Sequence, residues 1–333
     1  MLHIWLAGAV QTTPDGLFMA LGKASVPAMS ARDTVTFYLP PHLRKQAERS
    51  KQNFITKVGD VLTAAGLTVA FDNDDDLARL RALTRPGRGL YLMDPPANTR
   101  GLTFRKTYIY PFWHIEKEAE RWTWPVAQDP FDPKGVDARK AANFYRFWRN
   151  RLFEEAPNHA RKDGFVYVPL QGQLLRKRSF QSCSPLEMIQ TVLAHDTDRQ
   201  VVVTLHPSET YSPQERAALD DLLSGEDRLM IKPGGVPHYL QNCDYIVTQN
   251  SGVGFEGYFF GKPLILFARS DFHHIALNTD DIGPLQAFQR VENHVPDYAA
   301  YLFWFLQIRA INAGRPEAKK KIRDVLRNHG WPV

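Results

Sequence analysis

Short apolar runs rich in β-branched and aromatic residues alternate with helical patterns throughout the second half of the chain. Helical patterns separate these runs at about 184–195, 212–224, 236–242 and 253–261. A strand that returns after each helix is typical of a parallel, doubly wound sheet, because each helix crosses back over the sheet before the next strand begins. We therefore predict a Rossmann-like α/β domain with strands at 164–171, 200–207, 227–233, 243–250 and 262–268.

The first half has the same alternation, interrupted by a region of different composition. Strands are predicted at 2–8, 34–40, 67–72 and 89–94, with a helix-like stretch at 42–65. Residues 98–160 are rich in Trp, Tyr, Phe, Arg and Pro and contain an amphipathic helix at 137–156. The polar segment 157–164 is the best linker candidate. A chain of 333 residues is long enough for two domains, so we predict domains at 1–160 and 161–333, the second ending in helices at 294–329.

The composition is that of a globular protein. Hydrophobic residues make up 44% of the chain and charged residues 23%, and no run approaches the roughly 18 apolar residues of a membrane span. The apolar start lacks a basic segment, which favours a buried first strand over a signal peptide. Cys183 and Cys243 lack metal-ligand spacing and fit a reducing cytoplasm. The formal charge of +5 favours anionic ligands, but no nucleic-acid-binding module is recognisable.

Neither of two candidate metal-binding stretches has a convincing ligand pattern. The acidic run at 72–76 reads as a solvated loop before a helix. His273 and His274 are adjacent, so they do not easily share one helix face. We expect no metal ion.

The segment TQNSGVGFEGYFFGKP contains the pattern Gly-x-Gly-x-x-Gly at Gly252, Gly254 and Gly257. A dinucleotide-binding loop has this pattern, and Asp271 lies nineteen residues after Gly252, near the spacing of a ribose-binding acid. However, the motif lies in the last third of the chain and the helix that follows is short. We therefore favour a phosphate site at the start of that helix, where Ser251 is placed to cap it, over NAD or FAD.

Three elements in this order give the second half a family likeness. VVVTLHPSE is followed about forty residues later by CDYIVTQNSGVGFEGYFFGKPLILF, and VPLQ at 168–171 precedes both. Over 165–275 the chain resembles the nucleotide-sugar half of GT-B glycosyltransferases, in particular the bacterial capsule polysaccharide synthesis group. That group includes transferases that use CMP-activated Kdo, an eight-carbon acidic sugar. The resemblance implies a GT-B fold, with two Rossmann-like domains whose parallel sheets face a cleft, followed by C-terminal helices.

The resemblance also assigns binding roles. It implies that the first domain faces the acceptor and that the second binds the nucleotide sugar. Position in the short helix already predicts that Ser251 donates its hydroxyl to a phosphate and that Glu256, one turn in, reaches the two hydroxyls of a ribose. The resemblance adds that the loop after Lys232 would frame the base. The implied donor-binding set is Gln171, His206, Pro207, Lys232, Ser251, Gly252, Val253, Gly254 and Glu256.

The segment TYIYPFWHIEKE at 107–118 more faintly resembles a family segment built on a Tyr, an Arg-Pro-Asp-Trp core and a later Glu. The matching positions are Tyr108, Pro111, Trp113 and Glu116 or Glu118, whereas Tyr110 and Phe112 replace the Arg and the Asp. Because of these two replacements, the resemblance does not decide the donor sugar, the stereochemistry of transfer or which residues are catalytic.

Glycosyl transfer needs a base for the acceptor hydroxyl and a group that stabilises the departing phosphate. The catalytic candidates are Asp94, which ends an apolar strand, Glu116, and His206 beside the donor phosphate. Arg105 and Lys106 are candidates for binding an acidic sugar or acceptor.

The leading hypothesis is a cytoplasmic glycosyltransferase of capsule or surface polysaccharide synthesis. Its donor would be CMP-Kdo or a similar CMP-sugar, its acceptor a saccharide or glycolipid, and it would need no cofactor and no metal. Basic and aromatic residues also allow a peripheral contact with the inner membrane. The alternatives are a UDP-sugar transferase or a UDP-sugar 2-epimerase-like enzyme, and a non-catalytic scaffold of a polysaccharide synthesis complex.

Overall fold

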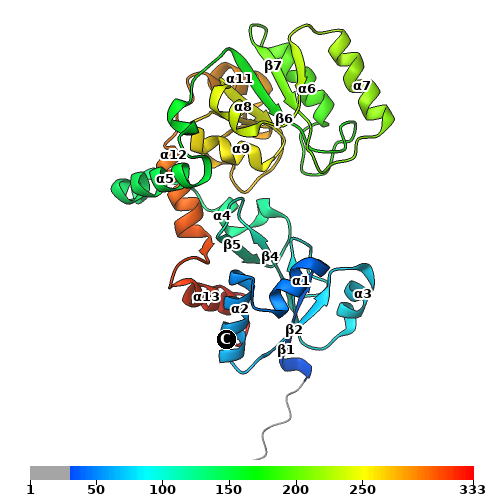
Figure 1. The fold of residues 1–333 in the computed structure, drawn as a ribbon, viewed down its shortest axis with the longest axis vertical. Coiled ribbons are helices and arrows are strands. Elements are labelled where there is room, and N and C mark those ends of the chain that lie inside the picture. Colours follow the sequence, from blue (N-terminus) through cyan, green and yellow to red (C-terminus); the bar gives the residue numbers. More distant parts are fainter. Residues whose placement is uncertain (1–30) are drawn as a thin grey trace, which may run out of the picture.

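The structure, a computed structural model, describes residues 31–333. The predicted strand at 2–8 lies outside the described residues. The described chain forms two α/β domains, each built around a six-stranded sheet (Figure 1). The prediction of two Rossmann-like domains is confirmed.

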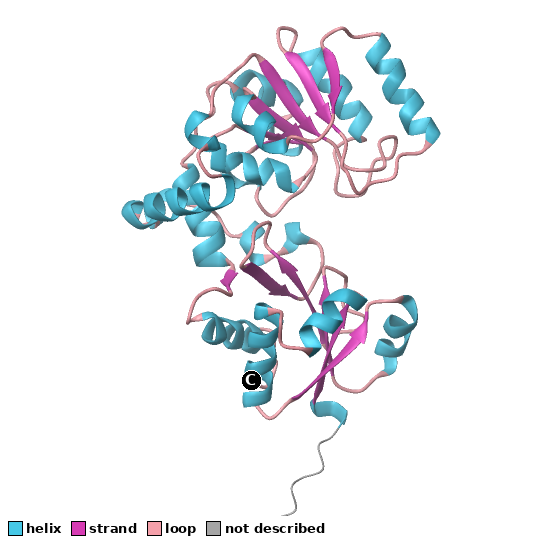
Figure 2. Ribbon diagram, viewed as in Figure 1, coloured by secondary structure: helices cyan, strands magenta, loops and turns pink. Residues whose placement is uncertain are grey.

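The second sheet is entirely parallel, with strand order β11-β10-β9-β6-β7-β8. Its helices lie on both sides of the sheet (Figure 2). Two of them begin with a Pro at their first position after a capping box, formed by Ser184 with Glu187 and by Ser212 with Glu215. The strands are β6 (Phe165–Pro169), β7 (Gln200–Thr204), β8 (Leu229–Lys232), β9 (Tyr245–Thr248), β10 (Leu264–Leu266) and β11 (Leu277–Asn278).

The helices of this domain follow its strands. They are α6 (Pro185–His195), α7 (Pro213–Ser224), α8 (Val236–Asn242), α9 (Gly252–Gly257), α10 (Thr279–Ile282) and α11 (Pro284–Val291), with 3-10 turns η5 (Tyr258–Phe260) and η6 (His273–Ile275). The strands and helices predicted for 164–268 are thus present, with ends that differ by a few residues.

The first sheet has the order β12-β5-β4-β3-β1-β2 and mixes strand directions. Strands β1, β2, β3 and β4 are parallel to one another, β5 is antiparallel to β4, and β12 is antiparallel to β5. These strands are β1 (Thr34–Leu39), β2 (Thr68–Asn73), β3 (Arg88–Leu92), β4 (Gly101–Lys106), β5 (Phe112–Glu116) and β12 (Ile311–Asn312). Its helices are α1 (Pro41–Glu48), α2 (Asn53–Ala64) and α3 (Asp76–Thr84).

The chain crosses between the domains twice. After β5 come η2 (Arg121–Thr123), α4 (Pro125–Gln128), η3 (Pro133–Gly135), α5 (Ala138–Phe153) and η4 (Ala156–His159), which lead into the second domain. The chain then returns through α12 (Tyr298–Leu302) and the π-helix η7 (Phe303–Arg309), and β12 and α13 (Ala318–Asn328) pack on β5 and α2. The expected second domain, 161–333, included this tail, whereas the structure places the tail on the first domain (Figure 1).

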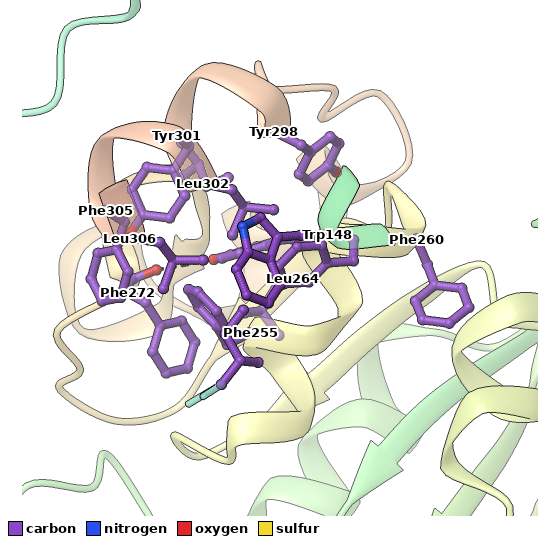
Figure 3. Packing of buried hydrophobic residues seen from close by; sticks show 14 of the residues in the cluster. Trp148, Phe255, Phe260, Leu264, Phe272, Tyr298, Tyr301, Leu302, Phe305 and Leu306 are labelled. Atoms are coloured by element: carbon purple, nitrogen blue, oxygen red, sulfur yellow. Dashed lines mark hydrogen bonds between the residues drawn. The ribbon is translucent and has the colours of Figure 1, made fainter. Parts of the chain in front are cut away.

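An aromatic cluster joins the two domains. It contains Phe112 from β5, Trp148 from the first crossing, Phe255 from α9, and Tyr301 and Phe305 from the returning segment, all buried. Figure 3 shows the last four of these side chains packed together. Phe255 lies 5.2 Å from Phe305 between ring centroids, and Phe112 lies 5.1 Å from Trp148. Aromatic residues that give 98–160 its unusual composition therefore form part of the core between the domains.

Candidate functional site

Strand β9 leads into α9 through a loop in which the glycines have a packing role. Ser251 caps the helix, since its hydroxyl accepts a hydrogen bond from the Val253 N–H (3.3 Å). A Cβ added at Gly257 would overlap Ile246 Cδ1, and one at Gly254 would lie 3.1 Å from Leu264 Cδ1. These two glycines let α9 lie close against β9 and β10, so the motif does not itself require a dinucleotide.

The same loop contacts the first domain at its first glycine. A Cβ at Gly252 would lie 3.3 Å from Tyr108 Cδ1, and the Tyr108 ring stacks on Phe255 with centroids 4.5 Å apart. Tyr108, in the turn between β4 and β5, has φ +55°, in the left-handed region. The family-like segment at 107–118 thus meets the glycine loop directly.

Asp271 is paired within the protein and lies between the domains. It accepts hydrogen bonds from the Tyr108 hydroxyl and from Arg121 (3.2 Å), and its side chain is only 1% exposed. Arg105 lies nearby, where burial and the like charge of Arg121 lower its pKa to about 10. Two arginines thus face one carboxylate, and the junction carries a net positive charge beside the glycine loop.

Glu256, on α9, takes no part in this paired group. Burial raises the pKa of its carboxyl group, and the charge of Lys106 from the first domain partly opposes that rise. The structure gives the Glu256 carboxylate no hydrogen-bond partner within residues 31–333. It also lies near Tyr167, whose hydroxyl is 2.9 Å from Thr204 Oγ1 and whose pKa it helps to raise. This carboxylate is therefore available to accept hydrogen bonds from a ligand.

The loops that follow β6 and β9 contain five of the twelve buried side-chain polar atoms that have no partner among the described residues. Among the described residues, they include Oε1 of Gln171 and of Gln249, Nε2 of Gln181, and both Nε and Nη2 of Arg178. Buried polar groups are paired in the great majority of cases, because leaving one unpaired costs about 1–3 kcal/mol. Several on adjacent strand ends indicate a place where a ligand supplies the missing partners.

Arg178 is held in place by aromatic residues from both domains. Its guanidinium lies 5.0 Å from the Phe180 ring centroid, and Phe180 stacks at 5.1 Å on Trp122 of the first domain. Arg269 lies over the Trp122 ring at 5.2 Å. Burial lowers the pKa of Arg178, and Glu209 from the neighbouring loop opposes this effect. The arginine is thus fixed beside the strand ends while two of its nitrogens remain unpaired.

Arg178 was not among the predicted site residues. It lies in a basic run at 176–180, in which Arg176 and Lys177 are exposed. The signal that distinguishes Arg178 is Phe180, an aromatic residue within a basic run, which provides a surface on which an arginine stacks. No sequence signal identifies Trp122 as the residue that stacks on Phe180, because these two residues belong to different domains.

His206 and Pro207 follow β7 and are exposed at its carboxyl end. The Ser208 N–H donates to His206 Nδ1 (3.2 Å), which leaves Nε2 directed outward as a donor. Lys232 ends β8, an edge strand, and is also exposed. Since neighbouring strands lie about 4.8 Å apart, the sheet order brings Gln171 next to Ser251 and leaves Lys232 three strands away.

The two predicted catalytic carboxylates lie in different places. Asp94 follows the carboxyl end of β3, where it is about half exposed and pairs with Arg79 (3.1 Å). Glu116 is opposite Thr103 in the antiparallel β4–β5 pair, so it lies three residues back from Lys106 and the carboxyl edge. There its carboxylate is 3.4 Å from His114 Nδ1. The fold does not bring Glu116 together with the 251–256 loop.

The described residues, 31–333, contain no cluster of three or more His, Cys, Asp or Glu side chains that is arranged to hold a metal ion. Within the same range no helix has the length and apolar character needed to cross a bilayer. A cavity of about 740 Å³ lies against α5, away from the donor-binding candidates.

Two Rossmann-like domains, joined by a double crossing and with the candidate residues at the strand ends of the second, define a protein of the GT-B architecture. The capsule polysaccharide biosynthesis protein family has a model that matches residues 132–315, more than half of the chain. The chain belongs to this family. The match includes the second sheet, α5 and the returning segment.

Solved structures with a similar fold include two KpsC transferases and an epimerase. The KpsC β-Kdo 2,7 transferase of Thermosulfurimonas dismutans has a TM-score of 0.47 and 16% identity, covering 88% of this chain and 99% of that chain. The KpsC β-Kdo 2,4 transferase of the same organism has a TM-score of 0.44 and 11% identity, covering 80% and 88%. The UDP-GlcNAc 2-epimerase of Neisseria meningitidis has a TM-score of 0.36 and 12% identity, covering 89% and 99%. No curated protein matches the chain significantly.

Proposed function

We propose that this protein is a glycosyltransferase of capsule polysaccharide synthesis that transfers an acidic, Kdo-like sugar from a CMP-activated donor to a saccharide or lipid-linked acceptor. The observation that carries the proposal is the group of unpaired buried polar atoms on Gln171, Arg178 and Gln249, beside the Ser251 loop. A ligand with both acceptor and donor groups and a negative charge would complete this group. A sugar nucleotide has all three.

The reaction assigns tasks to both domains. The bond between the anomeric carbon and the donor phosphate breaks, and CMP leaves with the bonding electrons. The acceptor hydroxyl oxygen bonds to the anomeric carbon and loses its proton to a base. Fixed N–H groups and cations stabilise the charge on the departing phosphate without a metal or another cofactor, a role we assign to Arg178, the 251–254 backbone and the His206 side chain.

For the base, we favour Asp94 over Glu116. General-base catalysis requires hydrogen-bond reach to the acceptor hydroxyl. Asp94 follows the carboxyl end of β3, the edge at which ligands of α/β sheets bind. The strand register sets Glu116 back from that edge, next to His114. We assign Glu256 to the ribose hydroxyls, because its carboxylate has no partner among the described residues.

One structural detail argues against the epimerase alternative. Epimerases of this architecture have an Asp before the loop serine, whereas this chain has Asn250 at that position. The Asn250 side-chain amide donates to the Arg269 carbonyl oxygen (3.2 Å), a bond that an unprotonated carboxylate does not make. The residue here supports the loop rather than acting as an acid or base.

The proposal includes a location at the cytoplasmic face of the inner membrane, because nucleotide-activated sugars are supplied from the cytoplasm. Its partners are then the sugar nucleotide and a saccharide or glycolipid acceptor.

Calorimetric titration of CMP, UDP and NAD into the purified protein tests the proposal. We expect CMP to bind. The substitutions Arg178→Ala, Ser251→Ala and His206→Ala should each weaken the affinity for CMP. For Arg178→Ala the loss should be about tenfold or more, which is roughly 1.4 kcal/mol. Arg176→Ala, an exposed arginine of the same loop, is the matched control and should change the affinity less than twofold.

Release of CMP from a CMP-Kdo donor, with and without acceptor, tests the reaction itself. Binding of UDP in place of CMP would change the donor and leave the fold assignment intact. If no nucleotide binds, the unpaired atoms serve another ligand and the non-catalytic scaffold becomes the better interpretation.

A further inference from the structure

A large cavity of the described chain lies outside the proposed donor site. It is a groove of about 740 Å³, within the range of roughly 300–1,000 Å³ of small-molecule sites. One wall is a face of α5, and the other is formed by η7, the residues around β12, and the turn between β4 and β5. We call it the α5 groove. It is lined by Tyr110, Pro111, Lys140, Asn143, Phe144, Phe147, Trp148, Arg151, Phe303, Gln307, Asn312, Gly314 and Arg315.

Aromatic side chains dominate the walls of the α5 groove. Phe144, Phe147 and Trp148 follow one another at helical spacing on α5, and Phe303 faces them from η7. Phe147 is 56% exposed, which makes it an unusually accessible large apolar residue, and Tyr110 is 49% exposed. A ligand that fits these walls has an apolar body.

The side-chain amide oxygens of the groove already accept hydrogen bonds within the protein. Asn312 Nδ2 donates to Gln307 Oε1 (2.9 Å), and Asn312 Oδ1 accepts from the Gly314 N–H (3.0 Å). Asn143 Oδ1 likewise accepts from Arg146 (3.3 Å). The groove therefore has little acceptor capacity left for the hydroxyls of a sugar, and its free polar groups are mainly donors and the cations at its edge.

Cations surround the groove, and none of its lining residues is acidic. Lys140, Arg151 and Arg315 are exposed at its edge, and helix α5 contains five basic residues and no acidic residue. Asp137, just before the helix, lies 3.7 Å from Lys140 Nζ and offsets one of these charges. The remaining positive charge complements a negatively charged head group beside an apolar chain.

We propose that the α5 groove binds an anionic phospholipid of a bilayer, with a hydrocarbon chain against Phe144, Phe147 and Trp148 and the phosphate beside Arg151 and Arg315. The groove thereby fixes which face of the protein meets the membrane. Helix α5 lies at the side of the molecule where the two domains meet, and it projects beyond both of them (Figure 1). This inference concerns a site separate from the donor residues, and it stands or fails independently of the donor's identity.

Co-sedimentation with vesicles tests the proposal, with the full chain and vesicles of phosphatidylcholine alone or with phosphatidylglycerol. We expect binding only to the vesicles that contain phosphatidylglycerol, and we expect Phe147→Ser and Arg151→Glu each to reduce the bound fraction at least threefold. Leu285→Ser is the matched control for Phe147, since both residues are 56% exposed. Arg290→Glu, on the same distant helix α11, is the control for the charge reversal. Circular dichroism of each variant verifies folding.

A soluble probe separates a lipid site from a phosphate site. We expect dodecyl phosphate to change the tryptophan fluorescence of the protein, Trp148→Phe to remove most of that change, and inorganic phosphate to have no effect at the same concentration. Equal vesicle binding by wild type and Phe147→Ser would overturn the proposal, as it would show charge-driven adsorption of a basic protein. Binding to phosphatidylcholine alone, or a response to inorganic phosphate, would overturn it as well.

Discussion

The junction between the domains and the carboxyl edge of the second sheet both contain buried charged and polar side chains, but the two regions differ in how fully these side chains are paired. At the junction, Arg121, Tyr108 and Asp271 bond to one another and leave Asp271 almost completely buried. At the sheet edge, Gln171 and Arg178 have buried atoms without a partner among the described residues. The first pattern stabilises the fold, and the second is what a ligand-binding site shows before its ligand arrives. Substitutions in the two regions should therefore have opposite signatures.

Breaking the junction should have the largest effect. Arg121→Met removes the cation that pairs with Asp271, whose side chain is 1% exposed. A buried charge without its partner destabilises a protein by about 3–5 kcal/mol, so we expect a loss of about 3 kcal/mol in chemical denaturation. Arg161→Met is the control, because its pair with Asp163 is largely exposed and should be worth less than about 1 kcal/mol. A loss below 1 kcal/mol for Arg121→Met would show that the junction pair is not structural.

Acidification should weaken the junction by a smaller amount. His274 contacts Tyr301 and the Asp129 carbonyl oxygen across the two crossings, and burial lowers its pKa to about 4. The unfolded chain takes up the proton near pH 6.5 and the folded chain only near pH 4, so stability falls as the pH decreases through this window, by on the order of 2 kcal/mol.

Denaturation curves between pH 7 and pH 4 measure this effect. His274→Gln should flatten the dependence, whereas His159→Gln, at an exposed histidine, should preserve it. An unchanged slope in His274→Gln would assign the acid sensitivity to other groups.

The sheet edge should give the smallest change in stability. Arg178→Met removes a half-buried cation that has unpaired nitrogens, so the free energy of unfolding should stay within about 0.5 kcal/mol of wild type or rise slightly. The same variant should lose nucleotide affinity. If Arg178→Met instead destabilises the protein as strongly as Arg121→Met, the stack on Phe180 and Trp122 is structural, and the contrast between the two regions disappears.

The second domain could be predicted closely from sequence because its signals are local. Each strand there is a short apolar run followed by a helix, and the sheet is parallel throughout, so no distant segment is needed to complete it. The glycine loop was found for the same reason, although the structure gives Gly254 and Gly257 a packing role that their spacing alone does not show.

The first domain depends on pairings that the sequence does not display. Strands β4 and β5 lie within the aromatic-rich region, where core residues such as Phe112 and Trp113 follow no clear alternation, and neither strand was predicted. Strand β12 has two residues and exists only because it pairs with β5, so a continuous helix was expected there. For the same reason the sequence did not show that Glu116 lies back from the carboxyl edge, since that position follows from the antiparallel register of β4 and β5.

The double crossing also limits how the domains can move. A domain attached by a single linker can tilt and twist about it in every direction. Here the chain enters the second domain near residue 160 and leaves it through η7, so two covalent connections hold the domains at separate points. The motion that stretches neither connection is a rotation of one domain about the axis that passes through both connections. Opening and closing over a bound sugar nucleotide would therefore follow one path, with the strand ends returning to the same alignment after every turnover.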